Sequence, residues 1–134
     1  MDCLKKEGMG CIALTPLAQG LLTNKYVSGV PAGSRATVQK SLLPEFLNEK
    51  SLARVKALND IVKRHSQSLA QMAIAWVLRN PRMTSALIGA SRPEQVEDCV
   101  GALANLRFSS EELAEIDQYA VDSNVNLWSK SSSY

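Results

Sequence analysis

The 134-residue sequence has few of the residue types that build a metal centre or a disulfide framework. It contains one histidine and three cysteines, and the cysteines are an odd number at unrelated spacings: Cys3, Cys11 and Cys99. Neither a zinc-ligand pattern nor a set of paired disulfides fits this distribution. We therefore expect reduced thiols and no metal. We also expect His65, near a helix end, to be an exposed cation rather than a catalyst.

Long apolar runs and a strong charge imbalance are missing too. No stretch approaches the roughly 20 apolar residues that span a bilayer, and residues 1–10 lack the apolar run of a signal peptide. The formal net charge of +2 does not favour a general nucleic-acid surface. Hydrophobic residues make up 46% and charged residues 21% of the chain, which is typical of a globular domain. We expect a cytoplasmic protein with no nucleic-acid and no membrane partner.

What the sequence does contain is a strand, turn and helix motif in residues 84–100. Residues 84–88 include a short apolar run, which predicts a buried strand that Gly89 ends. Ser91 and Glu94 have the spacing of a capping box, and a proline suits the first turn between them. A helix is therefore expected to begin at Ser91.

The start of this helix is a candidate anion site. A helix N-terminus has unpaired N–H groups and the positive end of the helix dipole, and Arg92 adds a guanidinium suited to phosphate oxygens. The motif thus predicts a phosphate site. The alternative is that Ser91 is only a helix cap and Arg92 only a solvated charge.

Local patterns predict the other elements. We expect the last turns of a helix at residues 2–7, a strand at 10–14, a long loop, and helices at 45–64, from Ser68 to about Leu78, and from Ser109 to Tyr119. The last two helices begin with capping boxes, and Met72 and Trp76 lie on an apolar stripe that is typical of a core.

Strands that alternate with helices predict a parallel sheet. Two strands alone leave both sheet edges open and cannot bury both faces, so we expect residues 1–134 to be part of a larger domain that has lost its beginning. In a (β/α)8 barrel, the loops after strands seven and eight commonly hold phosphate groups. The expected fold class is therefore α/β: the C-terminal portion of a (β/α)8 TIM barrel, its last two strands with their helices, incomplete as a barrel.

Three stretches carry a resemblance to a known family: TPLAQGLLT at residues 15–23, AQMA at 70–73 and LIGASR at 87–92. With them the sequence resembles the C-terminal part of an aldo-keto reductase over essentially its whole length. It looks most like the branch that contains bacterial glyceraldehyde-3-phosphate reductases and the β subunits of voltage-gated potassium channels, both of which bind NADP.

The resemblance implies a set of cofactor-binding residues. Those expected along the nicotinamide ribose and pyrophosphate of NADP(H) are Thr15, Pro16, Leu17, Ala18, Gln19, Gly20, Lys25 and Arg35. Those expected to hold the 2′-phosphate are Gly89, Ser91 and Arg92, and those expected to face the adenine are Gln95, Asp98 and Cys99. Without the resemblance, the cations at 25 and 35 would be interpreted as solvated loop charges.

Two departures from the family pattern concern this site. Asp98 and Cys99 stand where the family usually has glutamate and asparagine, so an amide that could bond the adenine edge is lost. Asn24 replaces a common glycine, and asparagine tolerates a left-handed backbone.

The catalytic aspartate, tyrosine, lysine and histidine of the family come from earlier in the barrel, so we assign none here. The hypothesis is the NADP(H)-binding part of an aldo-keto reductase that reduces aldehydes or ketones by hydride transfer, with the isolated chain inactive. Alternatives are a non-catalytic NADP-sensing subunit like those of potassium channels, against which Arg92 counts, or an inactive truncated product. The carbonyl substrate belongs to the full-length protein, and an oligomer or a partner chain that completes the barrel is a further hypothesis.

Overall fold

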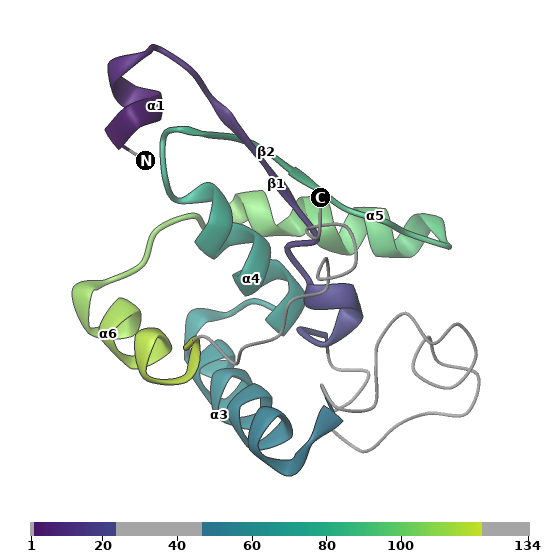
Figure 1. Cartoon of the computed structure of the whole chain (residues 1–134). Helices are drawn as coiled ribbons and strands as arrows, with labels where there is room; N and C mark the ends of the chain where they lie inside the picture. The colour runs from purple at the N-terminus through teal and green to yellow at the C-terminus, as the bar shows by residue number, and fades with distance from the viewer. Residues whose placement is uncertain (1, 24–46, 122–134) are drawn as a thin grey trace, which may run out of the picture.

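The computed structural model describes residues 2–23 and 47–121, in which strands and helices alternate as expected (Figure 1). The elements in chain order are α1 (Asp2–Lys6), β1 (Cys11–Leu14), the 3-10 turn η1 (Ala18–Gly20), α3 (Glu49–His65), α4 (Leu69–Leu78), β2 (Met83–Leu87), α5 (Pro93–Val100), the 3-10 turn η4 (Gly101–Ala104) and α6 (Ser110–Tyr119). None of the helices in these two ranges combines the length and apolar character needed to cross a bilayer.

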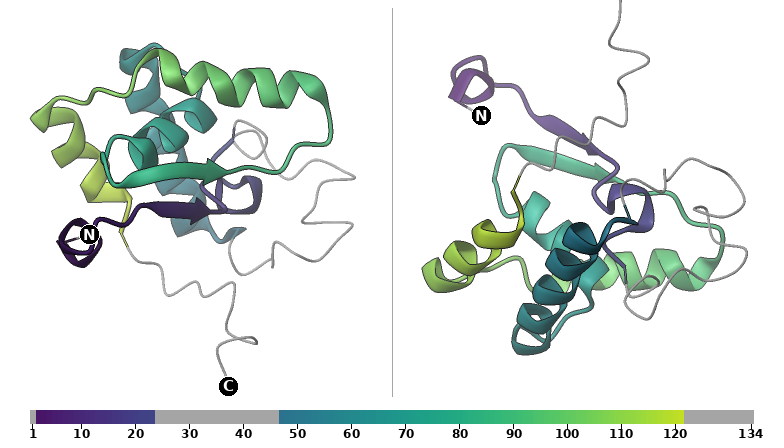
Figure 2. Two further views of the ribbon diagram at one scale, coloured as in Figure 1. Left: turned by 90° about the horizontal axis from the view of Figure 1, so that it is seen from above. Right: turned by 60° about the horizontal axis from the view of Figure 1, so that its bottom comes forward.

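The two described strands form a parallel pair, which confirms the sequence prediction. The partners in register are Cys11 with Met83, Ile12 with Ser85, Ala13 with Ala86 and Leu14 with Leu87, with an irregularity after the first pair. α4 packs against β2, and the right view of Figure 2 shows α3, α4, α5 and α6 on one side of the strand pair. Because the strands are parallel, their carboxyl ends lie at the same end of the sheet.

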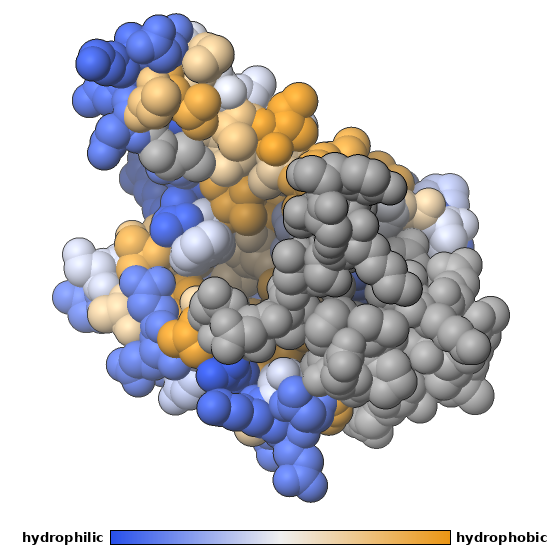
Figure 3. Space-filling view, viewed as in Figure 1, coloured by the Kyte–Doolittle hydropathy of each residue, from blue (hydrophilic) through white to orange (hydrophobic). Residues whose placement is uncertain are grey.

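The opposite face of the sheet is bare among the described residues. Side chains alternate between the two faces of a strand, and Ala13 and Ala86 are half-buried while Ile12, Leu14 and Leu87 are 61%, 59% and 57% exposed. Figure 3 shows this apolar surface in orange over the strands. The expectation of a buried strand at residues 84–88 was wrong, because helices cover only one of its two faces.

The hydrophobic core lies between α3, α4 and α6. Its buried members are Val55, Leu58, Ile61, Val62, Leu69, Met72 and Ile116. On α3 these residues recur at spacings of three and four, so they form one stripe that packs on α4 and α6. The assignment of Met72 to the core is confirmed, and Trp76 packs against the core from its edge.

Side-chain caps set the starts of the three core helices. The capping boxes predicted for α4 and α6 are both present, from Ser68 and Ser109. α3, however, begins at Glu49 and not at residue 45. Asn48 has an extended backbone, and its side chain accepts the N–H of Ser51 at 2.9 Å, so this strong N-cap fixes the start.

His65 is buried, which corrects the expectation of an exposed cation. The residue is only 5% exposed, its Nδ1 lies 2.9 Å from Oε1 of Glu112, and its Nε2 lies 3.4 Å from Nδ2 of Asn105. The imidazole also stacks on Phe108, with ring centroids 4.5 Å apart. These partners come from the first turn of α6 and the segment before it, so nothing near His65 in the sequence could reveal them.

Candidate functional site

The carboxyl ends of β1 and β2 open into one cleft of about 740 Å³. Its walls come from the segment after β1, the turn after β2, and one side of α5. The predicted site residues that line it are Thr15, Pro16, Leu17, Gln19, Gly20, Gly89, Ser91, Arg92, Gln95, Asp98 and Cys99. Two stretches about 70 residues apart in the sequence therefore meet here, because parallel strands deliver their following loops to the same edge.

Three predicted site residues stand apart from this group. Ala18 belongs to the same loop, in η1, but does not line the cleft. Lys25 and Arg35, like Asn24, lie outside the residues that the structure describes. The described part of the site is therefore the turn at residues 15–20 and the stretch at residues 89–99.

The turn after β1 holds several residues in the left-handed backbone region. Thr15, Ala18, Gln19 and Gly20 have φ values of 50°, 46°, 61° and 93°. Such a conformation costs a non-glycine residue about 1–3 kcal/mol and persists only where the surroundings enforce it. Here the N–H of Ala18 donates to the carbonyl of Thr15, and the N–H of Gly20 to that of Leu17, both at 2.9 Å. Backbone strain of this kind is concentrated at ligand-binding and active sites.

The start of α5 differs from the sequence prediction by two residues. Arg92 is extended (φ −145°, ψ 147°), the helix begins at Pro93, and no side chain caps it. Oε1 of Gln95, rather than Glu94, lies 2.8 Å from N and 3.2 Å from Oγ of Ser91. The proline explains the difference, because the residue before a proline is disfavoured in the helical conformation. The capping box that we expected between Ser91 and Glu94 was therefore wrong.

Arg92 places a positive charge in the cleft at the start of α5. Among residues 2–23 and 47–121, no side chain pairs with the exposed guanidinium of Arg92. At the other end of α5, partial burial raises the pKa of the Cys99 thiol, and the neighbouring Asp98 carboxylate raises it further. Cys99 is therefore a neutral thiol at physiological pH, and the cleft can offer an anion Arg92, together with the hydroxyl of Ser91 when it rotates away from Oε1 of Gln95.

Comparison with known proteins decides the family. The sequence profile described as the Aldo/keto reductase family matches residues 1–121. The chain belongs to this family. It is 50% identical, over an alignment of 136 residues, to proteins named L-glyceraldehyde 3-phosphate reductase from Escherichia coli O157:H7 and from Escherichia coli strain K12. Each alignment covers 98% of this chain and 39% of the relative.

Membership confirms the resemblance found in the sequence. Aldo/keto reductases fold as a (β/α)8 barrel, generally use NAD(P)H, and act on carbonyl substrates. The described part of this aldo/keto reductase is α/β with a two-stranded parallel sheet, which is consistent with part of such a barrel. The chain spans 39% of the length of the relatives that it matches.

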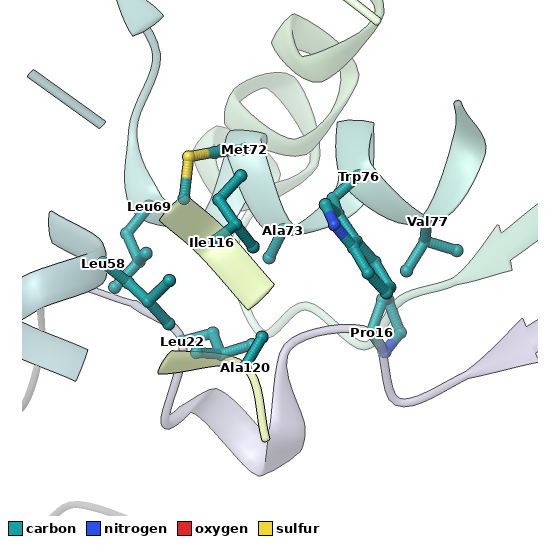
Figure 4. Close-up of a pocket in the computed structure, with 10 residues that line it drawn as sticks. All are labelled: Pro16, Leu22, Leu58, Leu69, Met72, Ala73, Trp76, Val77, Ile116 and Ala120. Atoms are coloured by element: carbon teal, nitrogen blue, oxygen red, sulfur yellow. The ribbon is translucent and has the colours of Figure 1, made fainter. Parts of the chain in front are cut away.

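A second, smaller cavity of about 160 Å³ lies between the segment after β1 and the core helices α3, α4 and α6 of this aldo/keto reductase chain (Figure 4). Trp76 and Pro16 lie on one side of it, and Leu22 and Leu58 lie on the other. Nε1 of Trp76 is buried without a hydrogen-bond partner in the described atoms, and the guanidinium of Arg79 lies 3.8 Å above the ring. The cavity is apolar, so it offers none of the groups that hydride or phosphate chemistry needs.

Sequence reasoning missed several residues that line the larger cleft: Leu14, Thr23, Ser68, Ala70, Leu87 and Ile88. The leucines are strand ends, whose position beside the loops follows once the strands are paired. Ser68 and Ala70 come from the start of α4, which the capping box located in the sequence but could not place in space. The packing of α4 against β2 and α5 brings them to the cleft.

Proposed function

We propose that this chain is the part of an NADP-dependent aldo-keto reductase barrel that holds the phosphates and adenine of the cofactor. The observation that carries the proposal is the single cleft at the carboxyl ends of two parallel strands, lined by both loops that resemble the family's cofactor loops. Its volume of about 740 Å³ lies within the usual range of ligand sites, about 300–1,000 Å³. In the whole reductase, bound NADPH would supply the hydride that reduces an aldehyde or ketone.

The donors in the cleft fit the proposed division of the cofactor. Arg92 and the hydroxyl of Ser91 suit the 2′-phosphate, because a charge-assisted pair with a guanidinium fork is the strongest common phosphate contact. The turn at residues 15–20 would lie along the ribose and pyrophosphate, where Gly20 at φ 93° allows close backbone approach. Asp98 and Cys99 would face the adenine. We include Lys25 and Arg35 as further phosphate contacts.

We further propose that the remaining strands of the barrel cover the bare sheet face, whether they belong to a longer chain or to a partner. Leu14 and Leu87 on that face are more than half exposed, and so are Val100 at the end of α5 and Leu103 in η4. Apolar surface on an open parallel pair is expected to be covered. The relatives are long enough to supply the cover, since the chain spans 39% of their length.

Purified alone, the 134-residue chain should not consume NADPH when an aldehyde such as glyceraldehyde 3-phosphate is added. The reason is that no residue of the chain matches the family's catalytic aspartate, tyrosine, lysine and histidine. NADPH absorbance should decay at the rate of a protein-free blank, while the Escherichia coli reductase serves as the positive control. Aldehyde-dependent NADPH loss that scales with the concentration of the chain would contradict this expectation.

The cofactor site itself is tested by alkylation of Cys99, which lines the cleft. NADP⁺ at about ten times its Kd should slow the reaction of Cys99 with iodoacetamide roughly tenfold, because only about a tenth of the sites stay open. The assay belongs at alkaline pH, since burial raises the pKa of this thiol. Peptide mass spectrometry gives the rate for each cysteine, and exposed Cys3 is the internal control. Equal rates at Cys99 with and without NADP⁺ would refute the proposed site.

A further inference from the structure

The side chain of Gln71, in the first turn of α4, joins this helix to α5. Its Oε1 accepts the N–H of Ser68 at 2.9 Å, which is one half of the α4 capping box. Its Nε2 donates to the backbone carbonyl of Asp98 at 3.0 Å and to Oδ1 of the Asp98 carboxylate at 2.9 Å. One amide thus satisfies the start of α4 and also holds a residue that lines the cleft.

Gly101, the first residue after α5, leaves the space that this amide occupies. A Cβ atom at position 101 would lie 2.5 Å from Nε2 of Gln71, which is closer than atoms in contact can approach. The backbone of Gly101 has φ −54° and ψ −21°, a right-handed conformation open to any residue. A side chain at position 101 would therefore displace the amide of Gln71 from its present place without straining the backbone.

We propose that Gln71 is a positioning residue for the cofactor cleft: it fixes α5 and the Asp98 carboxylate at the end of the cleft where the adenine would bind. This inference rests on the proposed function of the cleft. Gln71 itself does not line the cleft. It contacts Oδ1 of Asp98, which leaves Oδ2 as an acceptor for an exocyclic amine. Holding the carboxylate in one orientation before binding removes an ordering cost from the ligand complex.

The test compares NADP⁺ binding by calorimetry in the full 134-residue chain and in the variants Gln71→Ala, Gly101→Ala and the double variant. A net hydrogen bond is worth about 0.5–1.5 kcal/mol, so each single variant should weaken binding roughly 2- to 10-fold. Gly101→Ala displaces the same amide sterically and keeps the backbone unstrained. The double variant should bind no more weakly than the weaker single variant, because both changes remove one contact.

Gln67→Ala is the matched control. Gln67 precedes the N-cap of α4, and its Nε2 ties this link to the segment after α5, through the carbonyls of Ala102 at 3.1 Å and Asn105 at 3.2 Å, but it contacts neither Asp98 nor the cleft. This variant should lower the melting temperature while its NADP⁺ affinity stays within twofold of wild type. The loss in Gln71→Ala should also appear with adenosine 2′-phosphate, the adenine half of the cofactor, and not with nicotinamide mononucleotide.

The outcomes distinguish a failure of the role of Gln71 from a failure of the proposed cofactor site. A wild-type chain that binds no NADP⁺ overturns the proposed cofactor site and the role of Gln71 together. A wild-type chain that binds, with Gln71→Ala and Gly101→Ala both within twofold of it, overturns the role of Gln71 alone. So does an equal loss of affinity in Gln67→Ala, because that result would reflect general loosening of the α4 and α5 contact.

Discussion

Replacing Arg92 with alanine should weaken NADP⁺ binding by roughly 10- to 100-fold, because a hydrogen bond to a charged group contributes about 1.5–3 kcal/mol. Arg92 lines the cleft at the start of α5, and no described side chain pairs with its guanidinium. The cofactor lacking the 2′-phosphate, NAD⁺, should bind almost equally to wild type and variant. Isothermal calorimetry with both cofactors measures the ratio directly.

Two variants calibrate the Arg92 result. Arg92→Lys keeps the charge but loses the planar fork, so its affinity for NADP⁺ should lie between wild type and the alanine variant. Arg107→Ala removes the same charge from an exposed residue that does not line the cleft, and it should leave both affinities unchanged. Equal losses of affinity for NADP⁺ and NAD⁺ in Arg92→Ala would mean that Arg92 does not contact the 2′-phosphate.

Replacing Glu112 with alanine should lower the free energy of unfolding by about 2–4 kcal/mol. Glu112 has two roles in the folded chain. Its Oε2 accepts the N–H of Ser109 at 2.7 Å in the α6 capping box, and its Oε1 lies 2.9 Å from Nδ1 of buried His65. Truncation loses the Glu112 half of the capping box, while the Ser109 hydroxyl still accepts the N–H of residue 112. It also leaves a buried ring nitrogen unpaired, and each effect costs about 1–2 kcal/mol. Urea denaturation followed by circular dichroism measures the difference.

Glu115→Ala is the control for Glu112, because it removes a carboxylate three residues further along the same helix. Glu115 pairs with Arg64 at 2.6 Å, but both side chains are more than a third exposed. Exposed ion pairs contribute about 0–1 kcal/mol, so this variant should be nearly as stable as wild type. A Glu112→Ala variant as mild as Glu115→Ala would show that the His65 contact contributes little to stability.

The contribution of Glu112 to the free energy of unfolding should also disappear at acidic pH. The N–H of Ser109, and then the hydrogen bond with His65, lower the pKa of Glu112 in the folded chain, against a smaller effect of burial. A carboxyl whose folded pKa is lowered stabilises the fold fully above its unfolded pKa, about 4.3, and loses this effect as the pH falls through the folded value. The stability difference between wild type and Glu112→Ala should therefore shrink progressively below about pH 4.

Part of the candidate site could be predicted from the sequence. The strand at β1, the turn with Gly20, and the helix after Pro93 all follow from short patterns, and their parallel arrangement follows from the alternation of strands and helices. These inferences sufficed to expect both loops at one edge of the sheet, where the structure has the cleft. The left-handed Thr15 and Gln19 were not foreseeable, since neither residue type favours that conformation.

Local contacts are the part of this protein that the sequence determined. The capping boxes of α4 and α6 join residues three apart, and the apolar stripe of α3 repeats every three or four residues, so each can be found within one short window. The local pattern gave the wrong partner at Ser91. Glu94 and Gln95 both lie within reach of Ser91, and because Arg92 before Pro93 is not helical, Ser91 bonds to Gln95.

The tertiary structure alone decided which faces are covered and which distant groups meet. His65 is buried because Glu112, 47 residues later, packs beside it when α6 folds against α3. Gln71 reaches Asp98, 27 residues later, only because α4 packs against α5. The sheet face carrying Ile12 and Leu87 stays exposed for the same reason, since burial depends on which elements are present to cover a face. Contacts between elements depend on packing across the whole domain, which no pattern of neighbouring residues contains.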